Sequence, residues 1–236
     1  MNFANAFTPE RLQEAWECLL NEFPFAIWET LYATLLATFF AILIGLPLGV
    51  LLVTGEKKGV RPLPGPVMTA LNVFINFLRS VPFIILMVMI IPLTRALVGT
   101  SVGTTASVVP LAVAAFPFIA RLVESSLREI NPNIIEAAQS MGASPMQIIL
   151  HVMLPESVPS LVTNFTLAIT TIMGYTAMSG AVGGGGLGKL ALAYGYQRYR
   201  YAVLYLAVIV LVLITQLIQS FGTWLAARLD KRLKNQ

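Results

Sequence analysis

The residues that could do chemistry in this chain are few, and their spacing argues against catalysis. The run from Gly183 to Lys189 has the spacing of a phosphate-binding P-loop, but Leu190 stands where a serine or threonine must reach magnesium. A P-loop also follows a strand, and no strand is predicted here. With one histidine, His151, and one cysteine, Cys18, the chain lacks the partners of a zinc site or a Ser-His-Asp set. We therefore expect no catalytic residue, metal ion or other cofactor, and expect the cysteine to act as a small apolar side chain.

The glycines of that run allow two interpretations. The residues concerned are Gly183, Gly184, Gly185 and Gly186. Such a run can form a mobile gate or a surface for an external partner. It can equally form a re-entrant loop in which the missing side chains allow close packing. Both interpretations stay open on the sequence alone.

Arg79 is the one basic residue well inside a predicted membrane span. A charge in lipid is costly, so a residue of this kind is a functional candidate. Asn72 and Asn76 precede it on the same helix face, and Pro82 follows it. We expect Arg79 to lie where the helix breaks, near a water-filled vestibule or against freed carbonyl groups, in a structural or gating role.

A stripe of polar and soft side chains follows residues 158–178. Asn164, Thr171, Tyr175 and Met178 recur at spacings of seven, four and three residues, which places them on one helix face. The stripe offers a small solute an apolar passage with a few hydrogen-bonding groups. The alternative is helix packing through side-chain hydrogen bonds. We favour the path for Tyr175 and Met178, and packing for Asn164 and Thr171.

Membrane helices are the elements that must position these residues. Hydrophobic residues make up 57% of the chain and charged residues 11%, which is typical of an all-α integral membrane protein. Five apolar segments approach the ~20 helical residues that cross a bilayer. We place them at residues 27–54, 67–93, 105–123, 158–178 and 201–226. The third is the shortest, and two prolines interrupt it.

The cations divide between the two sides of these spans. One side holds Lys57, Lys58, Arg61, Arg121, Arg128, Arg228, Lys231, Arg232 and Lys234. The other holds Arg11, Arg95, Lys189, Arg198 and Arg200. Because the more basic side faces the cytoplasm, five spans place the N-terminus outside and the C-terminus inside. The same bias accounts for the net charge of +4, so we expect no nucleic-acid partner.

Residues 1–26 precede the first span and show no cleaved signal sequence. From Pro9 onward they predict an amphipathic helix on the external side. We expect it to lie along the membrane interface, with Trp16 at the depth of the headgroups. The alternative is a helix packed on the external loops.

Residues 132–155, between the third and fourth spans, form a polar segment on the cytoplasmic side. Asn131 can cap a first short helix that begins at Pro132, and Gly142 can end it in the left-handed conformation. A bent helical pair that projects into the cytoplasm is a suitable handle for a soluble partner.

The second helix of the pair has its own signals. Ser144 can cap it, with Pro145 in the first position and Gln147 completing a capping box. Leu154 and Pro155 are expected to end it. The lone histidine falls in this helix, where we expect a polar surface residue and not a metal ligand.

The residue pattern of this segment resembles the EAA loop of ABC importer permeases. The matching residues are Glu136, Ala137, Ala138, Gly142, Ser144, Leu154 and Pro155. In that family the loop forms a coupling helix that sits in a groove of an ATPase subunit. Gly142 would permit the sharp turn and the alanines close approach, while Glu136 would offer a charge to the partner.

A narrower resemblance covers nearly the whole chain. The matching blocks are residues 79–84, 98–104, 174–188 and 194–198. They are similar to the permeases of methionine importers, which are type I ABC systems. The resemblance implies a single transmembrane permease domain over residues 1–236, in the inner membrane of a bacterium. It also implies a second copy of the chain, two ATPase subunits, an external substrate-binding lipoprotein and surrounding lipid.

The function implied is ATP-driven import of D- or L-methionine by alternating access, with ATP hydrolysed on the partner subunit. A permease for another small amino acid is the first alternative. An ion-coupled secondary transporter is a weaker one, because no carboxylate lies deep in a predicted span and the two halves show no repeat. A membrane enzyme lacks a catalytic set.

Overall fold

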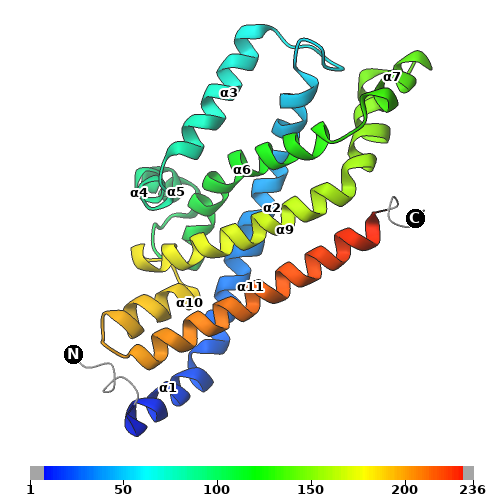
Figure 1. Cartoon of the computed structure of the whole chain (residues 1–236). Coiled ribbons are helices and arrows are strands. Elements are labelled where there is room, and N and C mark those ends of the chain that lie inside the picture. The colour runs from blue at the N-terminus through cyan, green and yellow to red at the C-terminus, as the bar shows by residue number, and fades with distance from the viewer. Residues whose placement is uncertain (1–7, 231–236) are drawn as a thin grey trace. The chain divides into compact units, whose positions relative to one another are not determined.

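The computed structural model describes residues 8–230, apart from the side chains of Glu10 and Leu12 (Figure 1). Every regular element in that range is helical, which confirms the predicted all-α class. The α-helices are α1 (Pro9–Asn21), α2 (Phe23–Thr54), α3 (Gly65–Ser80), α4 (Phe83–Met89), α5 (Ile91–Val98), α6 (Thr104–Arg128), α7 (Pro132–Ser140), α8 (Pro145–Gln147), α9 (Leu154–Ser179), α10 (Gly186–Lys189) and α11 (Tyr201–Leu229). The first seven residues of the predicted external segment and the three tail cations beyond Asp230 lie outside the described range.

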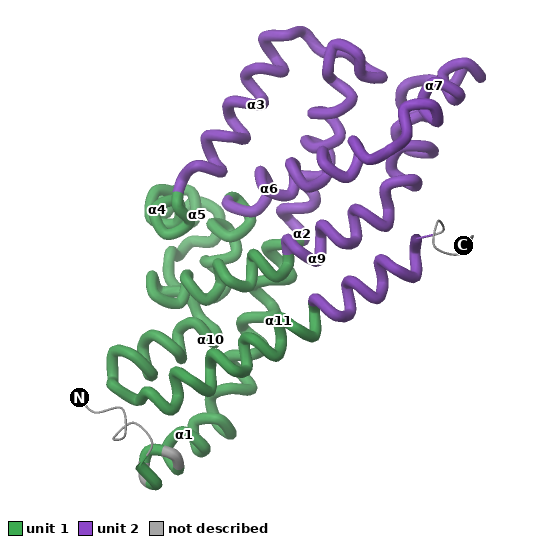
Figure 2. The backbone as a smooth tube through the Cα atoms, viewed as in Figure 1, with its two compact units in different colours: residues 1–38, 82–113, 169–218 green, residues 39–81, 114–168, 219–236 purple. Residues whose placement is uncertain are grey.

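The helices form two compact units, coloured separately in Figure 2. Unit 1 comprises residues 1–38, 82–113 and 169–218, and unit 2 comprises residues 39–81, 114–168 and 219–236. Four long helices, α2, α6, α9 and α11, contribute residues to both units.

Four helical stretches within residues 8–230 are long and apolar enough to cross a membrane, and a bent pair brings the number to five. The bent pair is α3 with α4, which covers most of the span predicted at residues 67–93, and the helix breaks after Arg79 as expected. The reason is Pro82, which disfavours the helical conformation at the residue before it. Val81 is accordingly extended, with ψ of 124°, and α4 begins after the proline.

The other predicted spans are found, with longer boundaries. α6 runs unbroken from Thr104 to Arg128 through both of its prolines, five residues beyond the predicted end at 123. α11 begins at Tyr201, as predicted. Because α6 continues past residue 123, the charged residues at its C-terminal end are helical. Charges on neighbouring turns can therefore form ion pairs.

In unit 1, α1 packs on the elements that surround the glycine-rich loop. Ala15 and Cys18 are buried in one cluster with Leu187 and Val203. This contact supports the alternative in which the helix packs on the external loops. The opposite face leaves Trp16 60% exposed, as an interfacial tryptophan requires.

Cys18 behaves as a small apolar residue. Burial raises the pKa of its thiol, and the nearby carboxylate of Glu22 raises it further, while Arg200 opposes them. A thiol with a raised pKa is a poor nucleophile and metal ligand, because the thiolate is the reactive form.

In unit 2, α2 and α6 approach closely through glycines. A Cβ atom built on Gly45 would lie 2.8 Å from the carbonyl oxygen of Phe116. One built on Gly49 would lie 2.5 Å from the carbonyl oxygen of Ala120 and 2.6 Å from Cβ of Val123. Small residues that let backbones approach are a common basis for helix association in membranes.

We expect Gly49→Ala to destabilise unit 2, because the new methyl group meets backbone that cannot move aside. Overpacking of this kind costs about 1–3 kcal/mol. Thermal unfolding in detergent should therefore begin at a lower temperature than in the wild type. Gly65→Ala is the matched control, since nothing lies within 4 Å of a Cβ atom at that position. Equal unfolding temperatures for the two variants would show that the close approach is not tight.

Candidate functional site

The first helix of the polar segment is built as its caps predict. α7 begins at Pro132, and the side-chain oxygen of Asn131 accepts a hydrogen bond of 3.0 Å from the N–H of Asn133. After the helix, Gly142 has φ of +79°, the left-handed conformation that a glycine adopts without strain. The helix therefore ends sharply, and the chain turns at once toward α8.

The second helix also begins as predicted. Ser144 and Gln147 form a capping box, in which the N–H of Ser144 donates to Oε1 of Gln147 at 2.8 Å and the N–H of Gln147 donates to Oγ of Ser144 at 3.5 Å. The sharp turn and this reciprocal cap together set the angle between α7 and α8.

The prediction that Leu154 and Pro155 end this helix is wrong. α8 continues through a π-helical turn, Ile148–Met153, directly into α9. In that turn the N–H of Leu154 donates to the carbonyl of Ile149, five residues earlier. A π turn changes the hydrogen-bond register of the helix, and Pro155, which has no N–H to donate, follows just after it. The second helix of the polar segment therefore continues into α9 as one helical rod.

The surface of α7 and α8 suits a docking role. Glu136 and Ala137 are exposed, while Ala138 is buried. Large apolar side chains are exposed around them, and sequence reasoning missed these: Ile134, Met141, Met146 and Leu150. Exposed apolar groups rimmed by polar ones mark a protein interaction surface. The sequence shows several large hydrophobic residues in this segment, but which of them are exposed depends on the fold.

A groove of about 260 Å³ lies in unit 2 beside Glu136. α7 supplies Ile135 and Gln139 to one wall, and the loop after α2 supplies Lys58 to the other. The coupling segment and the first loop therefore present one continuous surface.

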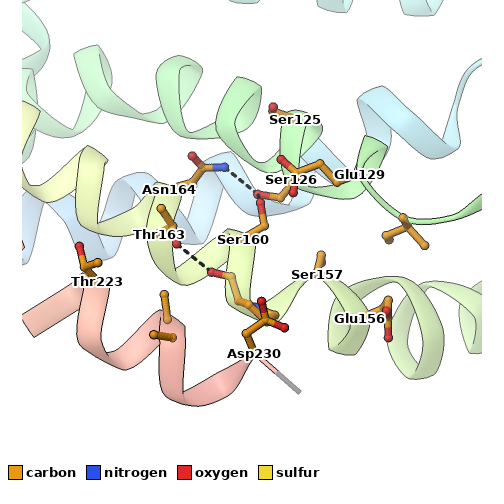
Figure 3. Close-up of a pocket in the computed structure, with 14 residues that line it drawn as sticks. Ser125, Ser126, Glu129, Glu156, Ser157, Ser160, Thr163, Asn164, Thr223 and Asp230 are labelled. Carbon is orange, nitrogen blue, oxygen red and sulfur yellow. Dashed lines mark hydrogen bonds between the residues drawn. The ribbon is translucent and has the colours of Figure 1, made fainter. Parts of the chain in front are cut away.

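The polar stripe on α9 divides between the two interpretations. In unit 2, the amide of Asn164 donates to Oγ of Ser126 at 2.8 Å (Figure 3). It also donates to the carbonyl of Leu122 at 3.3 Å. Ser160 donates to the same Ser126 hydroxyl at 3.1 Å. These bonds join α9 to α6, which is the packing role favoured for Asn164.

Figure 3 shows the cavity next to this contact, about 520 Å³ in volume. Hydroxyl groups of α6 and α9 line it together with Glu129, Glu156 and Asp230. Glu129, directly after α6, contributes its side chain to the wall of this cavity.

The rest of the stripe lies in unit 1. The ring of Tyr175 stacks on that of Phe83, with centroids 4.8 Å apart and an interplanar angle of 6°. Met178 is 46% exposed, and Thr171 is half-buried. Tyr175 is thus held by an aromatic neighbour, and Met178 presents the freer side chain.

The glycine-rich loop is anchored by three residues that sequence reasoning did not single out. The carboxylate of Glu29, on α2, accepts hydrogen bonds from the N–H of Gly186 at 2.8 Å and from the hydroxyl of Thr104. Next to it, Oγ1 of Thr30 accepts from the N–H of Leu187 at 2.9 Å. No local signal identifies these partners, because Glu29 and Thr30 lie 157 residues from the loop that they hold.

Close packing also explains the glycines themselves. A Cβ atom on Gly185 would meet the Thr104 hydroxyl and the Glu29 carboxylate, and one on Gly188 would meet the backbone of Ala177. Gly183 and Gly186 have φ of +93° and +76°, which favours glycine. A 3₁₀ turn and α9 precede the run, and no strand does within the described chain. The geometry is that of a closely packed loop, not of a P-loop.

Arg79 lies in the last turn of α3, ahead of the break at Pro82, as predicted, and its side chain is exposed. The two asparagines before it serve a different arginine. Nη2 of Arg121, on α6, donates to Oδ1 of Asn72 and Oδ1 of Asn76, each at 2.9 Å. Arg121 is therefore the arginine that the polar residues of α3 hold.

Comparisons with known proteins agree with this architecture. The family described as "Binding-protein-dependent transport system inner membrane component" matches residues 45–235. A probable D-methionine transport system permease protein, MetI, of Vibrio cholerae is 47% identical over 207 residues, which cover 88% of this chain and 92% of that protein. Its counterpart in Pasteurella multocida is 51% identical over 205 residues, covering 86% and 94%.

Solved structures show the same fold. A chain of the MetNI methionine ABC transporter, in an inward-facing conformation, matches with a TM-score of 0.84 at 45% identity and covers 86% of this chain and 94% of that chain. An amino acid ABC transporter matches with a TM-score of 0.72 at 19% identity, covering 96% and 100%. The chain belongs to the family of binding-protein-dependent transport system inner-membrane components and is the permease of an ABC importer.

Proposed function

We propose that this permease imports methionine, in the D or the L form, using ATP that a partner subunit hydrolyses. The observation that carries the proposal is the identity of 47–51% to relatives named as D-methionine permeases, over 86% or more of both chains. The working complex would contain two copies of this chain, two ATPase subunits and an external substrate-binding protein. The N-terminus would lie outside the cell and the C-terminus in the cytoplasm, as the distribution of cations requires.

The α7–α8 segment is the proposed contact with the ATPase. Glu136 and Ala137 are exposed for it, and the left-handed turn at Gly142 and the cap at Ser144 hold the angle of the pair. Leu154 and Pro155, where α9 begins, connect this contact to the fourth span. Movement of the pair would turn or tilt α9 as a rod.

For the solute path, we propose Tyr175 and Met178 as lining residues. Met178 is exposed in the single chain, and Tyr175 combines an apolar ring with a hydroxyl. Thr171 remains a weaker candidate on the same stripe, whereas the hydrogen bonds of Asn164 support packing. We assign Arg79 a gating or structural role at the break after α3, and the glycines 183–186 the role of a packed external loop.

An ion-coupled transporter is the alternative from another class. Glu29 and Glu124 do lie on helices that span the membrane, within two turns of a helix end. Both carboxylates are already occupied, by backbone and hydroxyl donors in one case and by two arginines in the other. A carboxylate with such partners is poorly suited to binding and releasing a transported ion.

Uptake by the reconstituted complex tests the proposal. Proteoliposomes that hold this chain, its cognate ATPase and ATP should accumulate labelled methionine when the binding protein is supplied outside. Unlabelled methionine should compete, and a panel of other amino acids should compete weakly. Accumulation without ATP, driven by a proton or sodium gradient, would refute the mechanism. ATP-driven uptake with stronger competition by another amino acid would refute the substrate.

A further inference from the structure

A chain of charged and amide side chains joins three segments of unit 2. At one end, Arg121 holds both asparagines of α3, as described above. It also donates to Glu124, one turn further along α6, at 2.7 Å. Arg128 donates to the other oxygen of Glu124 at 2.8 Å and to Glu56 at 2.5 Å. Glu56 lies in the loop that connects α2 to α3, so both the middle of α3 and the loop that leads into it are tied to α6.

The net charge of this cluster is zero, and hydrogen bonds fix the orientation of its side chains. Two arginines face two glutamates, and the guanidinium groups supply enough donors for all four partners. The amide of Asn72 is fixed by its own bond, in which Nδ2 donates to the carbonyl of Met68 at 2.9 Å, so that its oxygen faces Arg121. The side chains of Arg121 and Glu124 are 21% and 13% exposed, which limits screening by solvent.

The position of these residues on α6 gives them a mechanical role. α6 ends at Arg128, and only three residues separate it from α7. The connection is short, and it is packed against the rest of the chain, since Leu127 and Ile130 are only 2% and 5% exposed. A displacement of the coupling segment must therefore reach the end of α6, which carries both arginines.

We infer that Arg121 and Arg128 are positioning residues that carry movement of α7 to α3 during each transport cycle. The inference rests on the proposed coupling of α7 to an ATPase. Apolar contacts alone, such as the stacking of Phe74 on Phe116 at 6.4 Å, allow α3 to slide along α6. The polar clamp, formed by Asn72, Asn76, Arg121, Glu124, Arg128 and Glu56, prevents that sliding.

The test is methionine transported per ATP hydrolysed by the reconstituted complex. The double variant Asn72→Leu/Asn76→Leu removes both acceptors on α3 and keeps the branching and the number of side-chain heavy atoms. The ratio of methionine transported to ATP hydrolysed should fall about tenfold, because the charge-assisted contact between α3 and α6 is lost. The rate of ATP hydrolysis itself should stay within about twofold of the wild type. Arg95→Gln is the control for weakening an exposed polar contact elsewhere in the chain, where the guanidinium donates to Ser101 at 3.2 Å. An unchanged ratio in the double variant would overturn the inference.

A charge exchange separates positioning from folding. Arg128→Glu alone places a third carboxylate against Glu56 and Glu124 and should lower the ratio, whereas Arg128→Glu with Glu56→Arg restores the ion pair between positions 56 and 128 and should recover part of it. If the exchange variant is as impaired as the single variant, the clamp is not the transmitting element. The wild-type complex serves as the reference: without ATP-driven uptake there, it is the proposed function that fails, and not the clamp.

Discussion

Replacing Ala137 with tryptophan should reduce ATP-driven uptake by about 30-fold or more, which corresponds to the loss of about 2 kcal/mol at a central contact of the interface. Ala137 is exposed on α7 next to Glu136, and its small size lets the helix approach a partner closely. The indole ring has room in the isolated chain, so folding should be unaffected. The large effect is expected because a rigid side chain at the centre of the contact would hold the whole helix away from the ATPase groove. Co-purification of the ATPase with the tagged permease measures the loss of this contact, and the uptake assay measures its effect on transport.

Two controls define the result. Ala137→Ser keeps the side chain small and should retain both uptake and co-purification. Thermal unfolding of the Trp variant without the ATPase should match that of the wild type. Normal co-purification and uptake in the Trp variant would show that α7 is not the docking helix.

Local signals made the coupling segment the most predictable part of the molecule. The caps at Asn131 and Ser144 and the turn at Gly142 depend on residues within four positions, and each was found where it was predicted. The end at Pro155 was mispredicted because a helix can absorb a proline by changing its hydrogen-bond register over one turn. That choice depends on what the whole rod packs against, which a local pattern does not contain.

The long-range polar pairs could not be predicted from the sequence, for a different reason. Arg79 and Arg121 are equally plausible partners for Asn72 and Asn76 by residue type, and only the packing of α3 on α6 selects Arg121. The same holds for Glu29. Nothing in its local sequence singles it out, whereas the fold brings its carboxylate to the N–H of Gly186 in the glycine-rich loop.

Glu29 carries the second large expected effect. Glu29→Ala would leave the buried N–H of Gly186 and the hydroxyl of Thr104 without their acceptor. An unsatisfied buried donor costs about 1–3 kcal/mol, so loss of about 2 kcal/mol should speed hydrogen exchange at Gly186 by about 30-fold. Uptake should fall as well, because the loop would no longer be held against α2 and the start of α6. Exchange measured by mass spectrometry on the peptide around the loop tests this directly.

The comparison of variants at this position distinguishes a held loop from a mobile gate. Glu29→Gln keeps one acceptor oxygen and should fall between the wild type and Glu29→Ala in both exchange and uptake. Glu14→Ala is the matched control in the same unit, since its carboxylate makes only an exposed pair with Arg200 at 3.7 Å. If exchange at Gly186 rises in Glu29→Ala while uptake stays normal or increases, the loop acts as a gate that the carboxylate restrains. If both change as expected, transport depends on a fixed loop, and Gly185 serves close packing because a side chain there would displace the carboxylate that holds the loop.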